Sequence, residues 1–224
     1  MLGNSCCSNP TPVAQTPPEA AYHPDMPTPT PPDRLYYTGD EAADRLIAHD
    51  PLALLIGLQL DQQVTVQKAF SGPLELQRRL GALDAGAIAA LDPERLAQAF
   101  RERPAIHRFP GAMARRVQEL CAAVARDYGG DASRIWTEAT DARDLEARLL
   151  ALPGFGELKA RTMLGILGKR FGVRLAGWDE VAPRHATLGD VDSEASLATY
   201  QAGKRAYKAT LRAGGPAGSG GTAG

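Results

Sequence analysis

Helical periodicity recurs along the middle of this chain, and it restricts the fold more than any other feature. Apolar residues return every three or four positions, and no segment alternates apolar and polar residues long enough to indicate a strand. We predict one central core helix over residues 52–70, ended by Gly72 and Pro73. Its inward face consists of Leu52, Leu55, Ile56, Leu60 and Val64. The pattern predicts an all-α fold of about eight to ten helices.

The two ends of the chain differ in composition from the middle. Residues 1–33 contain nine of the 17 prolines and no lysine or arginine. Such a stretch cannot bury enough apolar surface to offset its ordering entropy, so we expect a disordered head. Residues 213–224 are mostly glycine and alanine, and we expect a second disordered segment there. The globular domain is therefore expected over residues 34–212, which is long enough to bury a core.

Charge and cysteine content exclude few functions. The domain holds all 25 basic residues and 23 of the 26 acidic ones, a formal charge of +2, which neither requires nor excludes nucleic acid. Cys6, Cys7 and Cys121 form neither a disulfide framework nor a metal cluster, and Cys121 is expected to be a buried apolar residue. The sequence contains no run of 18 apolar residues, so it predicts no membrane span. No signal peptide is recognisable at its start. A cytoplasmic location is therefore expected.

The stretch ALPGFGELKA, residues 151–160, predicts a turn between two helices. Pro153 ends the first helix, and Gly154 and Gly156 allow positive φ and close backbone approach. The second helix then begins with unpaired N–H groups, which favour an anion such as phosphate. Lys159 and Arg161 add positive charge nearby. The same residues also suit a plain corner between two helices.

Three segments in this order resemble the helix-hairpin-helix-GPD superfamily of DNA glycosylases. LPGFGELKA resembles the hairpin of that family, and LLIGLQLDQQVTVQKAF, residues 54–70, resembles its early core helix in 3-methyladenine glycosylases. RFPGAMARRVQELCAAV, residues 108–124, resembles a segment in which a glycine-containing turn leads into a helix with a basic residue. The resemblance covers about residues 44 to 192.

This resemblance implies an all-α fold of two lobes, and a function in base-excision repair. The partner would be double-stranded DNA with a damaged base, bound by a monomer without metal or cofactor. The residues implied in DNA binding are Gly154, Phe155, Gly156, Leu158, Lys159 and Gln63. The hairpin would hold phosphate, and Gln63 would enter the gap left by a flipped base. The alternative for Gln63 is the polar end of a helix facing water.

The hairpin departs from the family pattern at two positions. Leu158 stands where endonuclease III-type enzymes carry a lysine nucleophile, and Lys159 follows one position later. One position turns a helix by about 100°, so Lys159 is expected to point elsewhere, and no lyase activity is expected by that route. Glu157 weakens the attraction for phosphate. The absence of cysteine after Cys121 excludes the iron–sulfur loop of those enzymes.

The catalytic aspartate that the resemblance implies has three candidates. The family spacing points near Ala176, where no carboxylate stands. Asp179 is close in spacing, whereas Asp192 has the better local context, at the start of a helix, with Asp190 as its neighbour. Such a carboxylate stabilises positive charge on the sugar or activates water. The alternative for Asp190 and Asp192 is ordinary capping of the last helix.

The preferred interpretation is therefore a monofunctional DNA glycosylase that hydrolyses the N-glycosidic bond of a damaged base. The first alternative is a DNA-binding module that keeps the hairpin and lacks the catalytic aspartate. The second is an all-α interaction protein, in which the turn is only a corner. His107, Arg115 and Arg116 are interpreted as polar surface or as contacts to phosphate.

Overall fold

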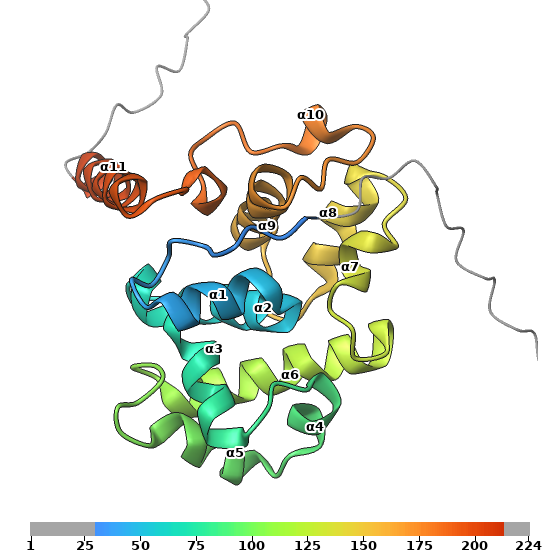
Figure 1. Cartoon of the computed structure of the whole chain (residues 1–224), viewed down its shortest axis with the longest axis vertical. Coiled ribbons are helices and arrows are strands. Elements are labelled where there is room, and N and C mark those ends of the chain that lie inside the picture. The colour runs from blue at the N-terminus through green and yellow to red at the C-terminus, as the bar shows by residue number, and fades with distance from the viewer. Residues whose placement is uncertain (1–29, 213–224) are drawn as a thin grey trace, which may run out of the picture.

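The computed structural model describes residues 30–212, and within this range the protein is all-α (Figure 1). The described residues form eleven α-helices and one short 3-10 helix, two of the α-helices being single turns that the sequence pattern did not predict. They are α1 (Glu41–His49), α2 (Pro51–Leu60), α3 (Val66–Leu80), α4 (Ala85–Ala90), α5 (Pro93–Arg101), α6 (Pro110–Tyr128), α7 (Arg134–Thr137), α8 (Ala142–Ala151), α9 (Glu157–Arg170), α10 (Trp178–Val181), η1 (Leu188–Asp190) and α11 (Glu194–Arg212). Of the head expected to be disordered over residues 1–33, residues 1–29 lie outside the described residues, as does the segment 213–224. Residues 30–33 have a defined place in the structure, and Asp33 contacts His49 and Arg45.

Within the described residues, aspartate side chains cap the starts of five of the eleven α-helices. The side chain of Asp40 accepts hydrogen bonds from the first amides of α1, and Asp50 does the same for α2. Further N-caps of this kind are Asp84, Asp92 and Asp141. Each satisfies N–H groups that have no partner inside the helix.

The prediction of one helix over residues 52–70 is wrong. The chain breaks at residues 61–65, where Gln63 takes a positive φ of 55° and Thr65 caps α3. Gly72 and Pro73 lie inside α3 and do not end it. Gly72 instead allows α2 to approach, because a Cβ there would lie 2.5 Å from Leu60. The break turns α3 back onto α2 and leaves a polar loop at the end of α2.

The helices pack in two sets around one continuous hydrophobic core (Figure 1). In the first set α1, α2 and α3 pack together, and α4 and α5 pack on α6. In the second set α8 packs on α7, α9 and α10, while η1 packs on α9 and α11. The core includes Cys121, which is fully buried as expected.

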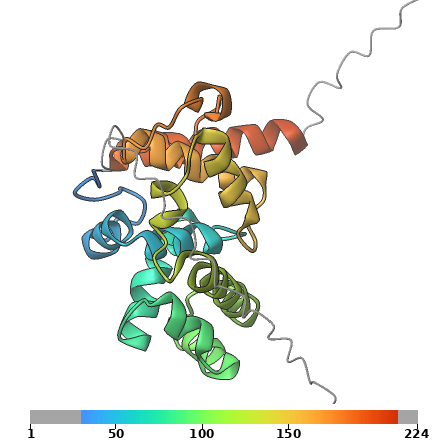
Figure 2. The ribbon, with the colours of Figure 1, turned by 90° about the vertical axis from the view of Figure 1, so that its right-hand side faces the viewer.

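The second set depends on two close approaches to α9. A Cβ on Gly189 would lie 2.1 Å from the carbonyl oxygen of Gly165, so η1 lies directly against the backbone of α9. A Cβ on Gly168 would lie 2.1 Å from the indole of Trp178, which fixes the loop before η1. Figure 2 shows α11 extending beyond the other helices, and residues 202–207 on it are exposed.

Candidate functional site

The turn between α8 and α9, residues 152–156, has a fixed backbone. The amide of Phe155 donates to the carbonyl of Leu152 at 3.0 Å, and Gly154 takes a positive φ of 78°. The Phe155 side chain is 5% exposed and belongs to the hydrophobic core. Phe155 therefore anchors the turn through its buried side chain, and its role in DNA binding stays a prediction.

Gln59 of α2 holds this turn from the other set of helices. Its side chain is fully buried and donates from Nε2 to the carbonyl of Pro153 at 3.3 Å. A Cβ on Gly154 would lie 2.3 Å from the same Nε2 atom. Gly154 is therefore required both for its positive φ and for the close approach of the Gln59 amide.

The N-terminus of α9 is open to a ligand. Gly156 is the N-cap residue, and no side chain among residues 30–212 caps the first amides of α9. A Cβ on Gly156 would meet nothing within 4 Å. The 14-residue helix adds the positive end of its dipole to these amides. An anion is the ligand that such a helix end favours.

Lys159 turns inward from the first turn of α9. Its amine donates to the backbone carbonyl of Gln59 at 3.0 Å and to the Gln59 side-chain oxygen at 2.7 Å. It also lies 5.5 Å from the ring centre of Phe155. Leu158 points the other way and is 73% exposed, so Lys159 does point in a different direction from residue 158, as expected.

Burial lowers the pKa of Lys159 to about 8. The negative charge of Asp61 acts in the opposite direction, and the positive charge of Arg116 adds to the lowering. The two oxygens that accept from the amine belong to Gln59 and carry no formal charge. They therefore stabilise the buried ammonium ion less than an ion pair with a carboxylate would.

Arg116 and His107 fix the loop at the end of α2. Arg116 donates from Nη1 to the Gln62 side-chain oxygen. His107 accepts from the Phe109 amide at Nδ1, 3.1 Å away, so its Nε2 carries the proton and donates to the Gln62 carbonyl at 3.0 Å. His107 is 1% exposed, and burial lowers its pKa. The interpretation of His107 as polar surface is therefore wrong.

An open cleft of about 580 Å³ lies beside the turn and the first residues of α9. Its lining residues are Asp61, Gln62, Arg116, Glu119, Gly154, Phe155, Gly156, Leu158 and Lys159. The set contains five of the six residues that the sequence assigned to DNA binding. The sixth, Gln63, is exposed in the adjoining loop and is not part of the lining.

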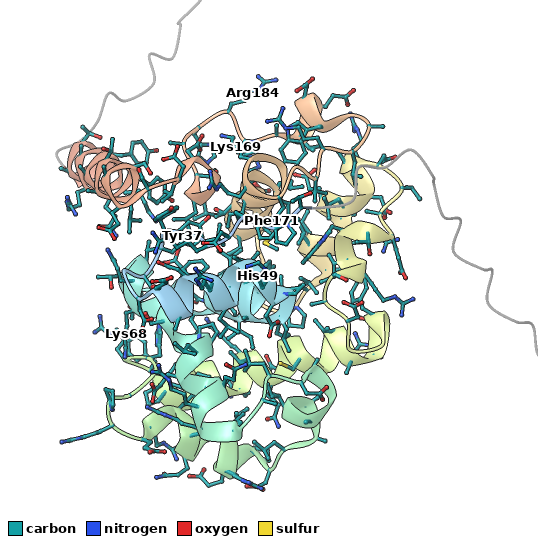
Figure 3. All side chains as sticks on the ribbon, viewed as in Figure 1. Tyr37, His49, Lys68, Lys169, Phe171 and Arg184 are labelled. Carbon is teal, nitrogen blue, oxygen red and sulfur yellow. The ribbon has the colours of Figure 1, made fainter. Side chains whose placement is uncertain are left out.

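The three candidate catalytic aspartates do not line this cleft. Asp179 is exposed on α10. Asp190 pairs with Lys169 at 2.6 Å and accepts from the Thr187 amide at 2.8 Å; burial would raise its pKa, but these bonds hold it below the usual range (Lys169 is labelled in Figure 3). Asp192 is exposed immediately before α11, where Ser196 and Ser193 lower its pKa.

Tyr200 of α11 has a raised pKa, to which one aspartate of the cleft lining and Asp190 both contribute. Burial, together with the negative charges of Asp61 and Asp190, raises the pKa of Tyr200 to about 12. Asp61 lines the cleft at the end of α2, and Asp190 belongs to η1.

Sequence reasoning missed Gln59, Asp61 and Glu119. A polar residue in the apolar run LLIGLQL was the available signal for Gln59, since buried polar groups need partners. Asp61 and Glu119 carried no comparable signal. Residues 30–212 hold no group of three or more His, Cys, Asp or Glu placed to bind a metal ion. In the same range no helix is long and apolar enough to cross a membrane.

The N-terminus of α9 offers a site for an anion at the edge of the cleft. The lining of the cleft contains two basic side chains, Arg116 and Lys159, and two carboxylates, Asp61 and Glu119. This arrangement can bind a phosphate at the end of α9 and place an attached group against Lys159 and Asp61. Comparison of the chain with models of protein families, with curated proteins and with solved structures gives no match.

Proposed function

We propose that the protein is a monofunctional DNA glycosylase of base-excision repair. The observation that supports this most is that the open N-terminus of α9 faces a cleft that also contains Arg116 and Lys159. The amides provide a site for phosphate, and the two side chains add positive charge. Such contacts hold nucleic acid by its backbone, without reading sequence.

Leu158 supports contact with DNA rather than with a free anion. It is a large apolar side chain, 73% exposed, at the edge of the cleft and in the first turn of α9. An apolar side chain beside a phosphate site can pack on sugar or on the face of a base. The two sets of helices, with a cleft where α2 and α6 meet the turn before α9, support the proposal of a two-lobed arrangement.

The proposed reaction is hydrolysis of the bond between a damaged base and its sugar, assisted by one carboxylate. We assign this role first to Asp192, because Asp190 already binds Thr187 and Lys169 with its two oxygens. Asp179 is the third choice. The carboxylate would stabilise positive charge on the sugar as the base leaves, or activate water.

DNA binding without catalysis is the second candidate function. It is favoured by one observation, which is that Asp179, Asp190 and Asp192 all lie outside the lining of the cleft. In that case the turn and the basic residues would hold DNA, and no base would be released.

Arg116→Ala is expected to reduce the salt dependence of binding to a short DNA duplex. Loss of one phosphate contact lowers the slope of log affinity against log salt by about 1. Arg115→Ala is the matched control, because Arg115 is the preceding residue, is exposed and does not line the cleft. Fluorescence anisotropy across a salt series measures both variants. Affinity of the unaltered protein that does not change with salt would argue against the proposal.

A further inference from the structure

The positive charge of the domain is concentrated on its last helix. Residues 34–194 hold 21 basic and 23 acidic residues, whereas residues 195–212 hold four basic residues and no acidic one. These four are Lys204, Arg205, Lys208 and Arg212, and all belong to α11. The rest of the domain is therefore slightly negative, and α11 alone makes the whole domain positive. A helix with charge of one sign attracts a partner of the opposite sign.

Residues 202–212 form the outer part of α11, and its described side chains are open to a partner. Residues 202–207 are all exposed, and Figure 2 shows this end of the helix projecting beyond the rest of the molecule. None of the ion pairs among residues 30–212 includes Lys204 or Arg205. The amine of Lys204 lies 5.2 Å from the ring centre of Tyr200, on the same helix. The charge of these residues is thus not neutralised by a carboxylate of the fold.

The outer part of α11 begins beside the candidate cleft. Gln201 donates from Nε2 to the side-chain oxygen of Gln67 at 2.9 Å, which ties α11 to the first turn of α3. Helix α3 follows the loop 61–65 directly, and the first two residues of that loop, Asp61 and Gln62, line the cleft. In Figure 2 the projecting end of α11 lies on the same side of the molecule as the turn before α9. One extended partner can therefore contact both places.

We propose that the outer part of α11 is a second DNA-binding surface, which contacts the phosphate backbone of the duplex outside the cleft. The inference rests on the proposed function, because the partner is the same duplex that the N-terminus of α9 holds. At about 1.5 Å per residue the outer part is about 16 Å long, which equals about five base pairs of duplex. Lysine and arginine side chains along such a length bind phosphates without reading sequence.

The composition of the outer part favours DNA over the other common anionic partner, a membrane surface. A helix that lies in a membrane interface carries several large apolar residues on one face. Residues 202–207 contain a single large apolar side chain, Tyr207, which is 65% exposed. One aromatic ring among basic residues is instead typical of a surface that binds nucleic acid.

The double variant Lys204→Ala with Arg205→Ala tests this proposal in the full chain. Alanine is a good helix former, so α11 is expected to remain helical, which circular dichroism checks. Fluorescence anisotropy with a duplex of about 20 base pairs should show about tenfold weaker binding at about 0.1 M salt. The slope of log affinity against log salt should fall by about 2, because two phosphate contacts are lost.

The matched control is the double variant Arg95→Ala with Arg126→Ala, which removes the same charge from exposed positions on α5 and α6. It should bind as the unaltered protein does. An equal loss in this control would show that net charge alone matters, and would overturn the proposal. Anionic vesicles containing phosphatidylserine are the second probe. Vesicle binding that the α11 variant loses, with DNA affinity unchanged, would assign the surface to a membrane and also overturn the proposal.

The unaltered protein separates this proposal from the proposed function. Salt-dependent binding of the duplex by the unaltered protein, with the same affinity and slope in the α11 variant, overturns the second surface and leaves the proposed function in place. Absence of duplex binding by the unaltered protein overturns both.

Discussion

Gly156→Ala is expected to weaken binding to duplex DNA about tenfold while changing the free energy of unfolding by less than about 1 kcal/mol. The backbone at Gly156 is extended, with φ of −95°, and a Cβ there meets nothing within 4 Å. The added methyl group therefore fits the folded protein. It stands, however, beside the first amides of α9, where a phosphate oxygen must approach.

Gly154→Ala is the matched comparison, because it adds the same methyl group to the same turn at a position where the fold has no room for it. Its φ of 78° and the Gln59 amide 2.3 Å from a Cβ make alanine unfavourable in the folded state. We expect a loss of about 2–3 kcal/mol of stability along with the loss of DNA affinity. Denaturant unfolding and anisotropy distinguish the two variants. Unchanged DNA affinity in Gly156→Ala would contradict phosphate binding at α9.

Gly189→Ala is expected to destabilise the fold by about 3 kcal/mol or more. A Cβ there would lie 2.1 Å from the Gly165 carbonyl oxygen and 2.9 Å from the Ile166 nitrogen. These are backbone atoms of α9 and cannot rotate away as a side chain can. The segment that holds η1 would have to move off α9, which would expose part of the core.

Gly203→Ala serves as the control for this prediction. Gly203 lies in α11, is exposed, and has nothing within 4 Å of a Cβ. Alanine there should raise stability by about 0.5–1 kcal/mol through helix propensity. Urea unfolding followed by circular dichroism measures both changes. Equal stability of the Gly189 variant and the unaltered protein would show that α9 and η1 do not pack as described.

Local signals were enough to predict much of the fold. The sequence predicts helices over residues 141–150 and 157–171 on either side of the turn, and the structure has them at Ala142–Ala151 and Glu157–Arg170, because Pro153, Gly156 and Asp141 act on their immediate neighbours. The break at 61–65 could not be predicted in this way. Leu60 of α2 packs where a Cβ on Gly72 would lie, and α3 continues through Pro73 although proline locally favours the end of a helix. Contacts of this kind between helices are not visible in local patterns.

The candidate site shows the same division between local and distant causes. The glycines of the turn are visible in the sequence, because their conformational role is local. The contact of Gln59 with Lys159 joins residues 100 positions apart, and the burial of His107 depends on the loop at Gln62. Periodicity contains no information about such pairs, so the inward direction of Lys159 and the membership of Asp61 in the cleft required the structure.

Release of a damaged base from duplex DNA tests the central claim most directly. Duplexes with a panel of single damaged bases are incubated with the protein, heated in alkali to cleave abasic sites, and resolved by length. We predict cleavage at one or more damaged bases with the unaltered protein, and a loss of at least about a hundredfold in Asp192→Asn, with Asp190→Asn and Asp179→Asn tested beside it. Activity unchanged in all three variants would contradict the catalytic assignment. No release from any damaged duplex would contradict the claim that the protein is a glycosylase.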